Sequence, residues 1–199
     1  MKKILMTVAF AALAIAGANA QTKFGVRAGL NLADVAIKSE DVKEESKIRP
    51  AFYVGGLAEF AFNDVVLMDA GLTYSNQGAK PKEGDGALVQ HALNLPVWFK
   101  YDFAGFRPKV GVNLGFLTKA ELKVKNNDGN SETLSFNPDK TFDFGLGVGA
   151  EYNLPFGLFF DATFNLGLTD VSTKEKTTEQ FPVLNMRNRV IQIGVGYKF

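Results

Sequence analysis

The sequence contains no cysteine, one histidine and one tryptophan among 199 residues. Without cysteine the chain can form no disulfide, thiolate metal site or cysteine nucleophile. A single histidine also disfavours a transition-metal site. The 22 basic and 21 acidic residues nearly cancel, so the charge gives no reason to expect a nucleic-acid partner. We therefore expect a protein with no cofactor, no metal and no nucleic acid bound.

Long hydrophobic runs are also missing from most of the chain. Beyond residue 20 no apolar run approaches the roughly 20 residues that a transmembrane helix needs, so any spanning segment there must be β-structure. The N-terminus has a basic start at Lys2-Lys3, an apolar run at Ile4–Ala16 and a small-x-small site at Ala18-Asn19-Ala20. This pattern predicts a cleaved signal peptide at residues 1–20 rather than an uncleaved anchor. Residues 21–199 then form one domain.

The clearest periodicity lies at the C-terminus, where apolar residues alternate with small or polar ones. Side chains on a strand have period two, so this pattern indicates a strand with one apolar face. A final apolar strand that ends on an aromatic residue is typical of an outer-membrane β-barrel, whose last strand closes on the first. The apolar residues of this barrel-closing strand are Ile191, Ile193, Val195, Tyr197 and Phe199.

Similar alternation recurs along the chain and predicts eight strands. Their connections alternate between long and short, with the short ones at 63–64, 102–106 and 153–157. Outer-membrane barrels have short periplasmic turns, long extracellular loops and an even strand count. We therefore predict an all-β fold, an eight-stranded antiparallel up-and-down transmembrane β-barrel with both termini periplasmic. The predicted strands are Thr22–Ala33, Pro50–Phe62, Val66–Gln77, Leu88–Tyr101, a strand from about Pro108 that continues toward Lys125, Thr141–Tyr152, Leu158–Thr169 and Arg187–Phe199.

Either face of such a barrel could in principle point inward. An eight-stranded interior is only just wide enough for side chains to fill, and the polar face carries most of the glycines, so we place that face inside and the apolar face against lipid. Balanced charges inside a narrow lumen suggest mutual pairing; a proton or ion path is the functional alternative. The predicted lumen charge network is Lys23, Arg27, Glu59, Asp69, Lys100, Lys109, Asp143, Glu151, Asp161 and Lys198.

Several runs together resemble the PorT-like outer-membrane β-barrel domain family. The runs are Leu72–Lys80, Leu93–Tyr101, Phe142–Glu151, Phe164–Val171 and Asn188–Phe199. The resemblance extends over essentially the whole mature chain and implies a small barrel in the outer membrane. It implies little about activity: the family takes its name from a member linked to a protein-secretion system, and no functional residues are carried over.

Other candidate sites have simpler structural explanations. His91 is expected to point outward as an interfacial aromatic, although small membrane-barrel enzymes use histidine near the outer rim. Asp128, Asn130 and Glu132 could offer oxygen ligands to a hard cation, but Asp128-Gly129 is foremost a hairpin signal. The mixed-charge segment 34–49 is expected to be a solvated loop, with a docking site as the alternative.

Pro96 interrupts the fourth predicted strand. Proline cannot donate to a strand ladder and normally lies at an edge or a bulge, yet a closed barrel has no edge. We therefore expect a local ladder defect at Pro96, in the first place a bulge. A bulge could turn Trp98 toward lipid, whereas a ladder that omits one bond would leave Trp98 inside. We favour the inward orientation of Trp98.

The sequence thus predicts a non-enzymatic integral outer-membrane barrel, structural or interaction-mediating, without a large open pore. A component of a protein-secretion machinery is the first alternative, and a small outer-membrane enzyme is the second. Expected partners are outer-membrane lipid, the barrel-assembly machinery during insertion, and a protein bound through the extracellular loops or the periplasmic rim.

Overall fold

The computed structural model describes residues 22–38, 49–79, 86–125, 131–136, 142–169 and 185–199. All secondary-structure elements in these ranges are β-strands. A helix with the length and apolar character to cross a membrane is not found in this part of the chain. The predicted signal peptide, most of the 34–49 loop and the 126–130 turn with Asp128 and Asn130 lie outside the described residues.

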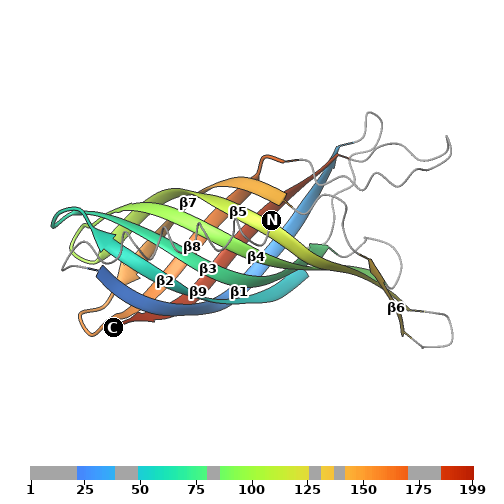
Figure 1. Cartoon of the computed structure of the whole chain (residues 1–199), viewed down its shortest axis with the longest axis horizontal. Coiled ribbons are helices and arrows are strands. Elements are labelled where there is room, and N and C mark those ends of the chain that lie inside the picture. The colour runs from blue at the N-terminus through green and yellow to red at the C-terminus, as the bar shows by residue number, and fades with distance from the viewer. Residues whose placement is uncertain (1–21, 39–48, 80–85, 126–130, 137–141, 170–184) are drawn as a thin grey trace, which may run out of the picture.

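The strands form one closed antiparallel sheet. Their order is β4-β3-β2-β1-β9-β8-β7-β5-β6, and β4 also pairs with β5, which closes the ring. Eight strands make the ring, because β6 pairs with the end of β5 outside it. The predicted eight-stranded up-and-down barrel is therefore confirmed (Figure 1). The strands are β1 (Thr22–Lys38), β2 (Arg49–Ala61), β3 (Val66–Ala79), β4 (Gly86–Tyr101), β5 (Phe106–Lys125), β6 (Ser131–Phe136), β7 (Phe142–Asn153), β8 (Leu158–Gly167) and β9 (Asn185–Lys198).

At the end of the long connections β1 runs further than the alternation pattern predicts, to Lys38. β5 continues as one strand of 20 residues to Lys125, in agreement with the predicted continuation of that strand. The end of β5 then pairs with β6 in the register Lys125↔Ser131 to Ala120↔Phe136. A tilted transmembrane strand needs only about 9–11 residues, so this β5–β6 hairpin projects beyond the barrel wall (Figure 1).

Tight turns join the strands at the opposite end, where the C-terminus lies (Figure 1). The Asn63 side chain accepts hydrogen bonds from the backbone N–H groups of Val65 and Val66, at 3.0 and 2.8 Å. The Asp102 carboxylate accepts one from the Gly105 N–H at 2.7 Å. Gly105 has φ of 97°, a conformation that glycine adopts without the steric cost of a Cβ. Short polar side chains and glycine thus set the turns at this end.

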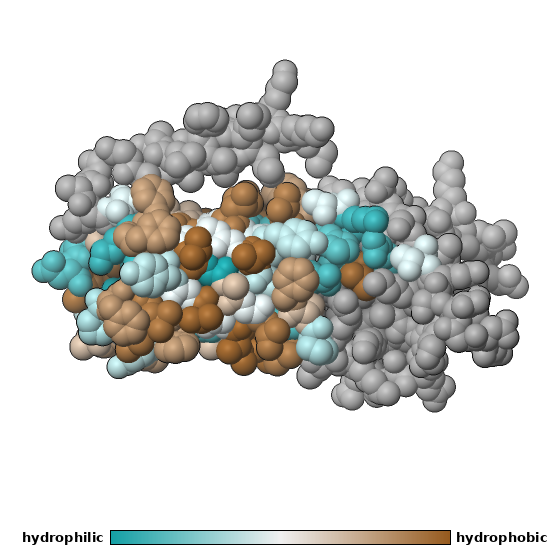
Figure 2. Space-filling model, turned by 90° about the horizontal axis from the view of Figure 1, so that it is seen from below, coloured by the Kyte–Doolittle hydropathy of each residue, from teal (hydrophilic) through white to brown (hydrophobic). Residues whose placement is uncertain are grey.

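The outer wall is apolar and the interior is polar, as predicted. Val26, Leu30 and Phe160 are each more than half exposed on the outside, and apolar side chains cover much of the wall visible in Figure 2. The buried set is dominated instead by charged, amide and hydroxyl side chains. A water-soluble barrel has the opposite arrangement, so the distribution fits a barrel whose wall contacts lipid.

Glycines on the inner face make room for three large aromatic side chains, Tyr53, Trp98 and Phe159. A Cβ added to Gly111 or Gly147 would lie 2.8 or 2.9 Å from a Trp98 ring carbon. A Cβ on Gly29 or Gly194 would come equally close to the Tyr53 ring. The expectation that glycine belongs on the crowded concave side is confirmed.

The ladder defect at Pro96 takes a milder form than a bulge. Toward β3, Val97 pairs with Ala70 and Asn94 pairs with Thr73, and the register is the same on both sides of the gap. Toward β5 the register shifts between His91 and Ala92 instead. The prediction of a bulge at Pro96 is therefore wrong, because the ladder omits bonds there without inserting a residue. Trp98 keeps its inward orientation and is 1 % exposed.

Candidate functional site: a charged plug in the barrel lumen

A lysine on β4 lies at the centre of a buried carboxylate cluster. The ammonium Nζ of Lys100 lies 2.9 Å from Glu59, 2.5 Å from Asp69 and 2.7 Å from Glu151. Glu59 and Asp69 are paired across β2 and β3, so their side chains point into the lumen side by side. Glu151 reaches the same point from β7. All four side chains are almost completely buried.

The closing strand supplies a second lysine to this cluster. Lys198 Nζ lies 2.6 Å from Glu59 and 2.5 Å from Glu151, and it donates a hydrogen bond to Asn153 at 2.9 Å. Glu59 and Glu151 therefore each contact both lysines. Lys198 lies on β9, which pairs with both β1 and β8. The C-terminal strand therefore contributes both to the ring and to the charge cluster.

Arg107 completes the cluster toward the short turns, and sequence reasoning missed it. Its guanidinium lies 3.0 Å from Glu59 and 2.7 Å from Asp102. The predicted strand begins at about Pro108, whereas β5 begins at Phe106, two residues earlier. Arg107 shares the inward parity of Lys109, which is the signal that could have identified it. We refer to Glu59, Asp69, Lys100, Arg107, Glu151 and Lys198 as the charged plug.

The acidic side chains of the plug also satisfy a simple distance test for metal binding. Carboxylate oxygens of Glu59, Asp69 and Glu151 lie within 4.8 Å of one another. The Lys100 ammonium, however, contacts all three and takes the central position that a cation would need. Buried carboxylates need a positive partner, and here the chain supplies it. The donor set therefore does not fit a metal site.

The other predicted lumen charges lie outside the plug. Lys109 pairs with Asp161, and its Nζ lies 4.9 Å from the centre of the Trp98 ring. Arg27 is buried with Thr73 as its hydrogen-bond partner. Lys23 is exposed and joins no ion pair of the described residues, so its assignment to the network is wrong. Asp143 is half-buried, lies apart from the plug, and accepts a hydrogen bond from Thr169 at 2.5 Å.

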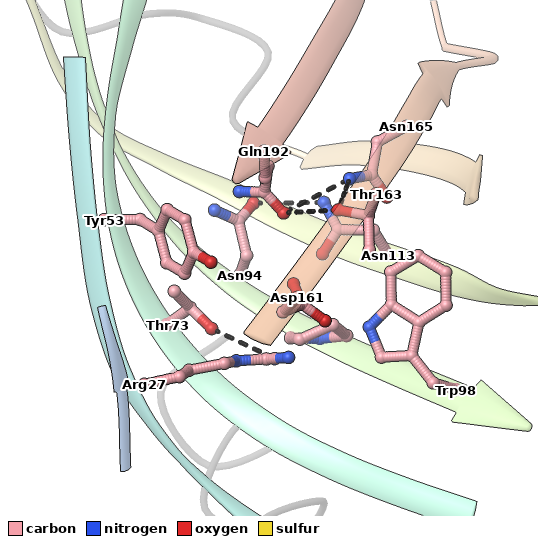
Figure 3. A pocket seen from close by; sticks show the side chains of 11 residues that line it. Arg27, Tyr53, Thr73, Asn94, Trp98, Asn113, Asp161, Thr163, Asn165 and Gln192 are labelled. Atoms are coloured by element: carbon pink, nitrogen blue, oxygen red, sulfur yellow. Dashed lines mark hydrogen bonds between the residues drawn. The ribbon is translucent and has the colours of Figure 1, made fainter. Parts of the chain in front are cut away.

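Uncharged polar side chains fill the lumen on the side of the plug away from the short turns. Asn31 donates to Ser75 at 2.7 Å and accepts from Gln192 at 2.8 Å. A small cavity lies among these side chains and offers about 10 Å³ to the centre of a water molecule, about the space of one water. The polar layer, as we name it, comprises Asn31, Thr73, Ser75, Asn94, Asn113, Thr163, Asn165 and Gln192 (Figure 3 shows six of them).

The apolar residues of the closing strand lie on the outer wall. Their side chains are between 43 and 70 % exposed. Phe199 is the most exposed of them, and its backbone N–H donates to the Phe24 carbonyl at 2.9 Å. The chain end is thus fixed to β1 while the apolar side chains of the closing strand face outward: Ile191, Ile193, Val195, Tyr197 and Phe199.

His91 lies beside the register shift on β4. Its Nδ1 lies 2.5 Å from the Tyr74 hydroxyl, and the two rings stack with centroids 6.0 Å apart. The side chain that contacts the His91 ring nitrogen is therefore a tyrosine rather than a serine or carboxylate of a catalytic triad. This geometry fits the interfacial aromatic role expected for His91.

Residues 5–199 match the outer membrane protein beta-barrel domain family. The chain belongs to this family. No match was found among curated proteins. Two similar solved structures are the attachment invasion locus protein Ail of Yersinia pestis and the Neisserial surface protein A. Ail is 15 % identical with a TM-score of 0.50, covering 89 % of this chain and 98 % of Ail. Neisserial surface protein A is 16 % identical with a TM-score of 0.55, covering 88 % and 97 %. These two likenesses support the fold.

Proposed function

We propose that this member of the outer membrane protein beta-barrel family is a non-enzymatic integral barrel, structural or interaction-mediating, that has no large open pore. The observation that carries the proposal is the charged plug, in which two lysines and three carboxylates from five strands meet inside the barrel. A conducting pore would need an open bore. The plug fills that space with side chains that hold one another.

The proposed orientation places the short turns and both termini in the periplasm and the β5–β6 hairpin outside the cell. Short periplasmic turns and long outer loops support this. The absence of native cysteine allows a clean test with single introduced cysteines. On intact cells, a membrane-impermeant maleimide is expected to label Thr133→Cys, which is exposed on β6, and to spare Asp64→Cys, exposed in a short turn. The reverse labelling pattern would contradict the orientation.

The protein is proposed to reside in the outer membrane and to contact lipid and the barrel-assembly machinery there. Outer-membrane lipid would cover the apolar wall, and the assembly machinery would act during insertion of the closing strand. The mature protein is expected to stay with the membrane fraction after a carbonate wash, since its wall is apolar. Recovery in the soluble periplasmic fraction would contradict a barrel inserted in the membrane.

The surface partner is proposed to be a protein bound at the projecting end. Replacing residues 122–134 by Asn-Gly would trim the β5–β6 hairpin and keep the Glu121↔Ser135 pairing that a two-residue turn can close. We expect this variant to fold and to lose a partner cross-linked to the intact protein on cells. If the trimmed variant still cross-links to the same partner, the partner binds at another loop or at the periplasmic rim instead of at the hairpin. A role in protein secretion, and with it the narrower PorT-like assignment, would require that the cross-linked partner be a component of a protein-secretion machinery.

A further inference from the structure

Among the buried cations of the described lumen residues, Arg27 alone has no acidic partner. Its side chain is 6 % exposed, and its hydrogen bond to the Thr73 hydroxyl is long at 3.5 Å. The guanidinium Nε has no hydrogen-bond partner. Within the described ranges no carboxylate lies within ion-pair distance of Arg27. Buried charges are normally paired, so this cation lacks a counter-charge.

Two further buried donors face the same place. The Tyr53 hydroxyl and the Trp98 indole N–H also have no hydrogen-bond partner, and both side chains are at most 2 % exposed. Arg27, Tyr53 and Trp98 line one cavity of the lumen (Figure 3). They reach it from β1, β2 and β4. Three unpartnered donors at one small cavity call for an acceptor beyond the Asp161 and Asn165 oxygens that also line it.

Two charged side chains line the cavity, Arg27 and Asp161. The Asp161 carboxylate is already paired with Lys109, which lies outside the lining, so the group of three side chains carries one positive charge more than it has acidic partners. One unpartnered acceptor, the Asn165 side-chain oxygen, lies in the same lining. The donors outnumber it, and a water could accept from only two of them.

We propose that this cavity binds one small monovalent anion of the halide class, held by Arg27, Tyr53 and Trp98. The anion would accept the three free N–H and O–H groups and neutralise the Arg27 guanidinium. The cavity offers about 10 Å³ to the centre of a water molecule, so phosphate and sulfate are too large for it.

A second cavity of about 20 Å³ shares Asn113, Asn165 and Gln192 with the first and continues to Asp143 and Val190. Three amide side chains and the Asp143 carboxylate therefore line the space next to the proposed site.

Trp98 is the only tryptophan and provides a direct reporter. Bromide quenches indole fluorescence by contact, and a buried Trp98 has little contact with bromide in bulk solution. Titrating the folded protein with bromide, at ionic strength fixed with gluconate, is expected to give saturable quenching that chloride reverses by competition. Quenching that rises linearly and weakly, without chloride competition, would mean that a bound water only occupies the cavity and would overturn the proposal.

The variants separate the site from general effects of charge. Arg27→Gln is expected to raise the half-saturating bromide concentration about tenfold or more, because a charge-assisted hydrogen bond is lost. Tyr53→Phe keeps the ring packed against Gly29 and Gly194 and is expected to cause a smaller increase. The matched control Lys23→Gln removes an exposed cation from the same strand and should change nothing.

A second measurement covers the case in which Arg27→Gln does not fold. Crystals of the unaltered protein soaked in bromide are expected to show an anomalous peak between Arg27, Tyr53 and Trp98, absent from Tyr53→Phe or weaker there. Equal quenching curves for Tyr53→Phe and the unaltered protein, with no peak in the cavity, would overturn the proposal independently of Arg27.

Discussion

The charged plug and the polar layer bury polar groups inside the same barrel in different ways. In the plug, Lys100 and Lys198 each contact two or more carboxylates at 2.9 Å or less. In the polar layer, amides and hydroxyls bond to one another and leave small cavities and unpartnered donors. The plug therefore closes the lumen firmly toward the short turns, whereas the polar layer can admit water or a small ion.

The comparison is tested most strongly by removing the central cation of the plug. Lys100→Met would leave Glu59, Asp69 and Glu151 buried around an apolar side chain. Breaking a buried pair in this way costs about 3–5 kcal/mol, so the free energy of unfolding should fall by that amount. Urea unfolding in detergent micelles, followed by circular dichroism, measures it.

The matched control is Lys119→Met, which breaks the exposed pair with Glu121. Exposed pairs contribute up to about 1 kcal/mol, so this variant should remain near the stability of the unaltered protein. Similar losses for Lys100→Met and Lys119→Met would show that the plug is no stronger than a surface pair.

A crowding variant tests how tightly the inner wall is packed between the two regions. A Cβ on Gly147 would meet the Trp98 ring, and overpacking of this kind costs about 1–3 kcal/mol. Gly147→Ala should therefore lower the free energy of unfolding, as measured by urea titration. Gly56→Ala is the control, because its nearest neighbour would be at 3.7 Å on the outer wall. Equal stability of both variants would contradict close packing around Trp98.

The polar layer should respond less than the plug. Asn31→Ala removes the hydrogen bonds to Ser75 and Gln192 and the longer ones to the Phe52 and Asn76 carbonyls. A neutral hydrogen bond contributes about 0.5–1.5 kcal/mol, and no buried charge is left without a partner. The loss of unfolding free energy should be below that of Lys100→Met in the same assay. A loss as large as that of Lys100→Met would remove the distinction between the two regions.

The smallest expected effect is lipid quenching of Trp98. Because Trp98 is buried in the lumen, brominated lipid chains should quench its fluorescence only weakly. A tryptophan introduced by Phe160→Trp in a Trp98→Phe background supplies the comparison, since Phe160 is exposed on the outer wall. Strong quenching of Trp98, equal to that of the Phe160→Trp variant, would place its ring in lipid.

The alternating pattern was sufficient to predict the barrel, its strand count and the inward face. Period two determines which side of the wall each residue occupies, and this placed Glu59, Lys100 and Glu151 in one lumen. The pattern could not give depth along the barrel axis. Lys23 has inward parity but lies exposed at an end of β1, and Asp143 lies apart from the plug.

Features that depend on strand register also escaped prediction. The alternation ends where side chains stop facing lipid, so the pairing of the predicted continuation of β5 with β6 was missed. The register shift at His91 and Ala92, rather than at Pro96, depends on how β4 meets β5. Arg107 was missed because proline at the next position suggested a strand start.

The closed lumen is tested most directly by planar-bilayer recording of the purified protein. The buried plug predicts that the inserted barrel shows no stable large conductance, because paired side chains occupy the bore. A steady conductance of porin size would contradict the closed lumen.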